Sequence, residues 1–105
     1  MSLKIAILGC GRMGRIRAEA AQLFGATLTH LCDPAIAHLD LDSHFPNVRC
    51  VSETSDLDFS QIDVLFICSP PHLHAEHMHL ALDHQTPFLI EKPLGITCQP
   101  LESVR

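Results

Sequence analysis

Residues 5–14 read IAILGCGRMG, an apolar run that leads into three glycines spaced G-x-G-x-x-G. The Ile- and Leu-rich run predicts a β-strand buried on both faces, and the residues after it have helical spacing. Gly9 would permit the tight turn out of the strand, Gly11 would let the backbone approach a pyrophosphate, and Gly14 would let the helix pack closely on the strand. The turn therefore predicts an anion site at a helix N-terminus, where unpaired N–H groups and the helix dipole favour negative charge.

A carboxylate follows at the distance expected for a dinucleotide site. The next apolar run, residues 26–32, ends in Asp33, about 20 residues beyond Gly14. A carboxylate in this place accepts hydrogen bonds from the adenosine ribose and repels a 2′-phosphate. Because Pro34 follows and no Lys or Arg is near, the sequence favours NAD over NADP. The alternative is that Asp33 is only a turn residue before a proline.

The composition limits the class of protein. With 105 residues the chain can hold one domain, and its 47% hydrophobic and 18% charged residues are typical of a folded globular protein. A net charge of -5 argues against a nucleic acid or an anionic membrane surface as a partner. No apolar run approaches the roughly 20 residues that span a bilayer, and no secretory signal is visible. We therefore expect a cytoplasmic protein.

Five cysteines occur, at positions 10, 32, 50, 68 and 98, without a C-x-x-C pair or a metal-ligand spacing. Four of them fall in or at the ends of predicted strands, which indicates reduced thiols in the core. Cys10 differs because it lies inside the glycine turn, and the alternative for this cysteine is a partly exposed, reactive thiol.

Apolar runs alternate with helical patterns along the chain. Strands are predicted over residues 5–8, 26–32, 48–52, 62–68 and 87–91; helices are predicted after Gly14 and over 72–85, with a short, poorly defined helix over 35–44 and the start of one more at Thr97. This alternation predicts a doubly wound parallel α/β sheet of Rossmann type, with about five strands in the order 3-2-1-4-5. The ligand crevice would lie where the order reverses, at the carboxyl ends of the first and fourth strands.

Three stretches carry a resemblance to a known family. They are residues 9–14 (GCGRMG), 68–74 (CSPPHLH) and 91–94 (EKPL), the last at the end of the fifth predicted strand. In order and spacing they resemble the glucose-fructose oxidoreductase, inositol dehydrogenase and rhizopine-catabolism (Gfo/Idh/MocA) family of NAD(P)-dependent sugar oxidoreductases. The resemblance covers the whole chain but only the N-terminal, dinucleotide-binding part of a family member.

The resemblance implies a set of site residues. The implied cofactor-binding residues are Gly9, Gly11, Arg12, Met13, Gly14, Asp33, Ser69, Pro70, His74 and Glu91. Of these, Ser69 and Pro70 would line the nicotinamide side of the cleft, His74 would help to shape it, and Glu91 would lie near the nicotinamide ribose. Position 71 is often Asn in relatives and is Pro here, which removes one polar contact.

Lys92 resembles the family's active-site lysine, which hydrogen-bonds the substrate hydroxyl that loses its proton as hydride passes to the nicotinamide. An ammonium at the mouth of a partly dry cleft would stabilise a developing alkoxide, and Pro93 would restrict the backbone of Lys92 to the extended region. Without the E-K-P context, a surface lysine at a strand end would be the preferred interpretation. The resemblance also implies a sixth strand and a second, substrate-binding domain that residues 1–105 lack, so we expect weak NAD(H) binding and little or no turnover of a sugar or polyol.

Two other hypotheses compete with this one. The first is a metal site, since His74 and His77 lie three residues apart and His72, His79 and His84 are near; but these side chains would point around a helix, so we expect no physiological metal. The second is a non-catalytic module. If the sheet stops before a sixth strand, the fifth strand is an unpaired edge, residues 88–90, through which the chain would form a homo-oligomer or pair with another chain. A degenerate relic that merely folds is a further possibility.

Overall fold

The computed structural model describes the backbone of residues 3–92 and 95–99, and the side chains of residues 3–90. The elements are β1 (Lys4–Leu8), α1 (Arg12–Leu23), β2 (Thr27–Cys32), α2 (Leu41–His44), β3 (Arg49–Val51), β4 (Val64–Ile67), α3 (Pro71–Asp83), β5 (Phe88–Lys92) and β6 (Gly95–Gln99). Short 3-10 turns occupy Ile36–His38, Thr54–Asp56 and Phe59–Gln61. The short, poorly defined helix predicted over residues 35–44 is thus a 3-10 turn followed by the single turn of α2.

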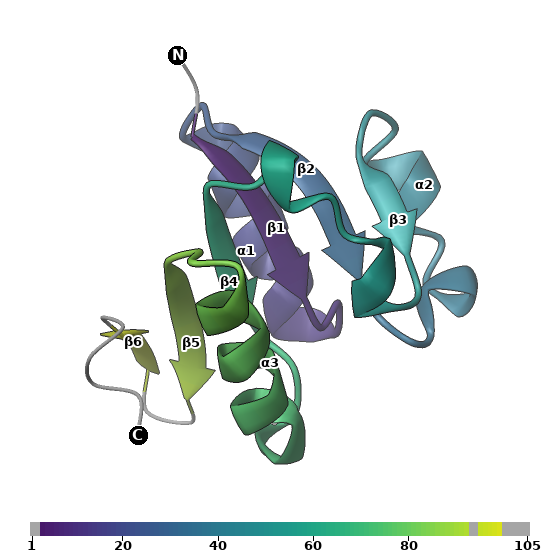
Figure 1. Cartoon of the computed structure of the whole chain (residues 1–105). Helices are drawn as coiled ribbons and strands as arrows, with labels where there is room; N and C mark the ends of the chain where they lie inside the picture. Colours follow the sequence, from purple (N-terminus) through teal and green to yellow (C-terminus); the bar gives the residue numbers. More distant parts are fainter. Residues whose placement is uncertain (1–2, 93–94, 100–105) are drawn as a thin grey trace.

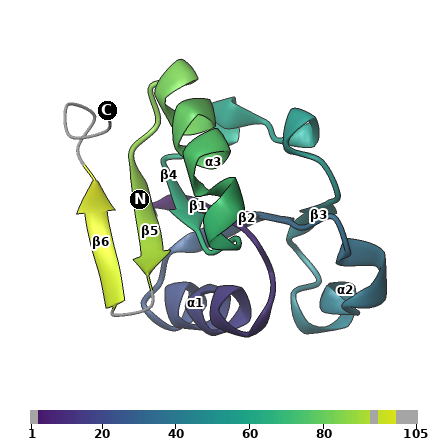
Figure 2. The ribbon, with the colours of Figure 1, turned by 90° about the horizontal axis from the view of Figure 1, so that it is seen from below.

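The strands form one sheet in the order β3-β2-β1-β4-β5-β6 (Figure 1). The first five are parallel, which confirms the predicted order 3-2-1-4-5. Figure 2 shows α1 and α3 on opposite sides of this sheet. The order reverses between β1 and β4, so the turns after these two strands open the crevice in which doubly wound folds bind ligands.

The end of the described chain corrects two predictions. Residues 95–99 form strand β6, antiparallel to β5, with Gly95 opposite Lys92 and Gln99 opposite Phe88. The helix predicted to start at Thr97 is therefore wrong; β-branched Ile96 and Thr97 suit a strand. The unpaired edge predicted at the fifth strand is wrong too, because β6 occupies it, as Figure 2 shows.

The core has two halves, one on each face of the sheet. Strand β1 alternates between them, with Ile5 and Ile7 in the half under α1 and Ala6 and Leu8 in the half under α3. All four side chains are nearly or fully buried. This central strand is therefore held from both sides, as its uninterrupted apolar sequence predicts.

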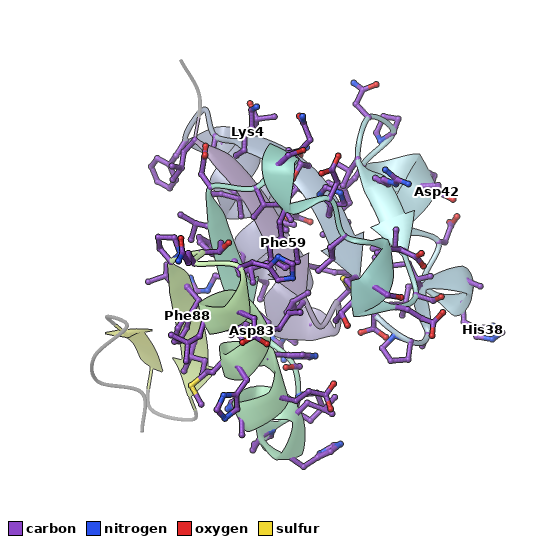
Figure 3. The ribbon with its side chains drawn as sticks, in the orientation of Figure 1. Lys4, His38, Asp42, Phe59, Asp83 and Phe88 are labelled. Atoms are coloured by element: carbon purple, nitrogen blue, oxygen red, sulfur yellow. The ribbon has the colours of Figure 1, made fainter. Side chains whose placement is uncertain are left out.

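Helix α3 is anchored at its far end. Phe88 of β5 is 1% exposed and belongs to the core half under α3. The ring of Phe59, in the connection before β4, stacks on the ring of His84 just after α3 with centroids 3.7 Å apart (Figure 3). These contacts fix the helix whose first turns border the crevice.

In the described part of the chain, no helix has the length and apolar character needed to cross a membrane.

Candidate functional site

The turn after β1 leaves no room for side chains at two of its glycines. Gly9 has φ +92°, and a Cβ there would lie 2.5 Å from the backbone nitrogen of Ser69. A Cβ at Gly14 would collide with the carbonyl oxygen of Gly9. Any other residue at position 9 or 14 would push the turn away from the β4 connection or from α1. The turn, the start of α1 and the residue after β4 are thus in direct backbone contact.

Gly11 differs, because it faces open space. A Cβ at Gly11 would meet no atom within 4 Å. Gly11 is also the N-cap of α1 and gives the helix no side-chain cap. The first capping backbone bond runs from the N–H of Arg15 to the carbonyl of Gly11 (3.0 Å), so the N–H groups of residues 12–14 precede it and have no helical partner. This end of α1 offers unpaired donors to an anion.

Asp33 lies beside this turn, at the carboxyl end of β2. One of its carboxylate oxygens, Oδ2, accepts a hydrogen bond from the N–H of Cys10 (2.8 Å), and Oδ1 accepts one from the N–H of Ala35 (2.8 Å). The carboxylate is partly exposed. The second bond gives Asp33 the role of a turn residue as well, so the two interpretations of this side chain are compatible.

Ser69, two residues after the end of β4, is buried and held by two histidines of α3. Its carbonyl oxygen accepts a hydrogen bond from Nε2 of His74 (2.7 Å). Its hydroxyl shares a hydrogen bond with Nδ1 of His77 (2.7 Å). Burial lowers the pKa of His77 and the neighbouring His74 lowers it further, whereas Glu76 acts in the opposite direction. The neutral imidazole is therefore the favoured form of His77.

A cavity of about 460 Å³ opens between these elements. Its lining residues are Leu8, Gly9, Cys32, Asp33, Pro34, Ala35, Ser52, Glu53, Thr54, Ser69, Pro70, Leu73, Glu76 and His77. The structure thus brings together four residues proposed from the sequence: Gly9, Asp33, Ser69 and Pro70. His74 does not line the cavity and is connected to it by its hydrogen bond to the carbonyl of Ser69.

Several residues of this cavity were not proposed from the sequence. Residues 52–54 follow β3 and so lie at the same carboxyl edge of the sheet, a signal that the predicted strand order contained. Glu76 and His77 lie one and a half turns into α3. His77 lies within the helix predicted over residues 72–85, but nothing in the sequence pairs it with Ser69.

The thiol of Cys10 is buried, with 1% of the residue exposed, so the partial exposure considered for it is wrong. Its Sγ lies 3.6 Å from the carbonyl oxygen of Cys32 and donates to it. Burial raises the pKa of Cys10 far above the ordinary range, and the charge of Asp33 raises it further. Burial also raises the pKa of Cys32 to about 11. Cys10 is thus an unreactive thiol of the hydrophobic core, buried beneath the glycine turn.

Two histidines of α3 make hydrogen bonds within the fold. Both His74 and His77 bond to Ser69. Within residues 3–90, whose side chains are described, no three His, Cys, Asp or Glu side chains gather as metal ligands.

Glu91 and Lys92 end strand β5. Because β5 is parallel to β4, its end lies at the same edge of the sheet as the glycine turn and Asp33. The roles predicted for these two residues depend on their side chains, which lie outside the described residues.

Comparison with known proteins agrees with this geometry. A model of an oxidoreductase family with an NAD-binding Rossmann fold, Gfo/Idh/MocA, matches residues 3–104. The chain belongs to this family. As a Gfo/Idh/MocA domain it carries the family's NAD-binding fold, and the resemblance inferred from its three motifs is confirmed.

Three known proteins are similar to this domain over most of its length. Inositol 2-dehydrogenase 1 of Paenarthrobacter aurescens is 29% identical in an alignment of 97 residues that covers 89% of this chain and 29% of the relative. The crystal structure of scyllo-inositol dehydrogenase from Lactobacillus casei, with bound NAD(H) and scyllo-inositol, is 31% identical with a TM-score of 0.74, over 90% of this chain and 29% of that one. An oxidoreductase from Agrobacterium radiobacter, solved with NAD+, L-tartaric acid and magnesium, has a TM-score of 0.78 at 25% identity over 90% of this chain and 29% of that one. The Gfo/Idh/MocA domain described here thus spans about three tenths of the length of these proteins.

Proposed function

We propose that this chain provides the cofactor half of an oxidoreductase that transfers hydride between a polyol or sugar hydroxyl and NAD. The observation that carries the proposal is the cavity in which Gly9, Asp33 and Ser69 meet at the switch point of the sheet. The substrate class comes from the inositol dehydrogenases among its relatives. NAD, when bound, supplies the hydride acceptor.

Different residues of the chain would bind different parts of the cofactor. Asp33, which lines the cavity, would accept hydrogen bonds from the adenosine ribose hydroxyls, and its charge would repel a 2′-phosphate. The pyrophosphate would lie over Gly11, where the space that a Cβ would occupy is open. It would accept hydrogen bonds from the backbone N–H groups of Arg12, Met13 and Gly14. Ser69 and Pro70 line the same cavity as Asp33, which supports a place for them on the adenosine half rather than on the nicotinamide side suggested by the resemblance.

The reactive end of the cofactor would extend toward the end of β5. There Glu91 would lie near the nicotinamide ribose, and the ammonium of Lys92 would donate a hydrogen bond to the substrate hydroxyl oxygen and stabilise the alkoxide that develops there. The backbone of β5 supports this role, since it brings both residues to the edge of the sheet that carries the glycine turn. The substrate contacts themselves would come from a second domain.

Calorimetry tests the binding half of the proposal. Titration of the chain with NAD+, NADH and NADP+ should show saturable binding of one NAD(H) per chain and weaker binding of NADP+. Absence of saturable binding at millimolar NAD(H) would contradict it.

A chimera tests the chemical half. This chain would replace the matching segment of inositol 2-dehydrogenase 1 from P. aurescens, so that the relative supplies the rest of the protein. The chimera should reduce NAD+ with inositol, and Lys92→Ala should abolish turnover while NAD+ still binds. A chimera that binds NAD+ and oxidises no polyol would exclude the proposed reaction.

We also propose a cytoplasmic location and leave the homo-oligomer as a prediction. Cell fractionation tests the first, and light scattering on the purified chain tests the second.

A further inference from the structure

Ser69 is the point at which three parts of the site meet. It follows β4, it borders the cavity, and its backbone nitrogen lies 2.5 Å from the position that a Cβ of Gly9 would take. Only 5% of the residue is exposed. A shift of Ser69 would therefore move both the cavity wall and the glycine turn that it supports.

The two histidines hold different atoms of this residue. A carbonyl oxygen only accepts, so Nε2 of His74 carries a proton and donates to the Ser69 carbonyl. This bond holds the backbone. The bond between Nδ1 of His77 and the Ser69 hydroxyl instead fixes the direction of the side chain on the cavity wall.

The surroundings of His77 favour its uncharged form. The residue is 8% exposed, and burial is the largest cause of its lowered pKa. The charged or titratable groups around it are Glu76 and His74 on its own helix, with Asp33 after β2 and Glu53 after β3 lining the same cavity. A second proton on the ring would place a cation on this desolvated wall, which favours movement of the ring toward water and release of Ser69.

We propose that His77 is a positioning residue of the cofactor site, which holds the Ser69 hydroxyl against NAD only while its imidazole is neutral. The inference rests on the proposed NAD site and adds to it a residue of the cavity wall that acts through its bond to Ser69. It makes cofactor affinity depend on pH through a group that is remote from the reacting atoms. Affinity for NAD+ should fall as the pH is lowered through the titration of His77.

The experiment measures the dissociation constant of NAD+ by calorimetry at about pH 8 and about pH 5.5, on either side of the ordinary titration range of histidine. The variants are His77→Leu, which removes the bond, and His77→Asn, which keeps a polar group near the place of Nδ1 but does not titrate. His79, exposed on the same helix, supplies the matched controls His79→Leu and His79→Asn. Thermal unfolding monitors the fold of each variant.

At the higher pH, His77→Leu should weaken NAD+ binding about fivefold, the equivalent of one hydrogen bond of about 1 kcal/mol. His77→Asn should stay within about twofold of the parent and lose the pH dependence, and both His79 variants should behave as the parent. Ser69→Ala should weaken binding as His77→Leu does, and the double variant should be no weaker than either single one.

Three results would overturn the inference: parental affinity in a folded His77→Leu, an unchanged pH profile in His77→Asn, or fully additive effects of the two single variants. If His77→Leu does not fold, the pH profile of His77→Asn still decides. Absence of NAD+ binding by the parent chain would be a different failure, since it would remove the proposed function and this inference with it.

Discussion

The carboxylate of Asp33 accepts a hydrogen bond of 2.8 Å from the backbone N–H of Cys10, which connects the end of β2 to the turn after β1. The same carboxylate accepts the N–H of Ala35 through its other oxygen. One side chain thus orders the glycine turn and the connection after β2 before any ligand is present. Its two structural bonds and its proposed bonds to ribose hydroxyls share the same oxygens.

Asp33→Ala should therefore affect both stability and binding. We expect a loss of about 1.5–3 kcal/mol in the free energy of unfolding, since two hydrogen bonds to a charged acceptor disappear. NAD+ affinity should fall at least about tenfold, and the preference over NADP+ should narrow because the repelling charge is gone. Urea unfolding and calorimetry measure the two effects. Asp83→Ala, at the exposed end of α3 (Figure 3), is the control that should leave NAD+ affinity unchanged; an equal loss in both variants would contradict the role of Asp33.

The glycines of the turn should separate folding from binding. Gly9→Ala and Gly14→Ala should each cost more than about 3 kcal/mol in the free energy of unfolding, because the new methyl group would meet backbone atoms. Gly11→Ala should cost no more than about 1 kcal/mol, the usual penalty for Ala at an N-cap. It should nevertheless weaken NAD+ binding at least about tenfold, since the methyl group would occupy the space left for the pyrophosphate. Chemical unfolding with NAD+ calorimetry checks this, and a Gly11→Ala variant that binds NAD+ as the parent does would place the phosphates elsewhere.

His30 should make stability depend on pH. The ring is 2% exposed, its Nε2 accepts the N–H of Asp58 (3.3 Å), and its Nδ1 therefore donates to Thr29 (2.9 Å). Burial lowers the pKa of His30, and the charge of Arg49 lowers it further, while Asp58 raises it.

Because the unfolded chain binds this proton more readily, the contribution of His30 to stability is complete above about pH 6.5, the unperturbed value. It is lost as the pH falls from there toward the lowered pKa of the folded state. Urea unfolding between about pH 7.5 and about pH 5 should show the decline, and His30→Gln should reduce it. His38→Gln, at an exposed position (Figure 3), is the control. An identical slope in His30→Gln and the parent would exclude His30 as its source.

Cys10 should resist alkylation in the folded protein. Its thiol is buried and its pKa is raised by burial, so little thiolate is present near neutral pH. The partly buried Cys50 and Cys68 should react with iodoacetamide before Cys10 does. Mass spectrometry of digests taken during the reaction measures the order, and the urea-unfolded chain supplies the unprotected rate. Modification of Cys10 at that unprotected rate in the native protein would show that the turn opens.

The order of the parallel strands could be predicted because each signal is local. The apolar run, the glycine turn and the carboxylate after the next strand all lie within residues 5–33. The right-handed chirality of crossovers then leaves few ways to connect the strands. The strand over residues 95–99 could not be predicted in this way. A five-residue segment with a polar neighbourhood takes its conformation from the partner it pairs with, and here that partner is β5.

By itself, the sequence determined the fold class, the glycine turn and the position of Asp33 at the end of the second strand, since backbone requirements at these positions restrict the residue type. Only the tertiary structure decided that His77 bonds to Ser69 and that Cys10 is buried. These contacts join segments far apart in the chain. They depend on strand register and on how α3 lies against the sheet, and neither is encoded in the spacing of neighbouring residues.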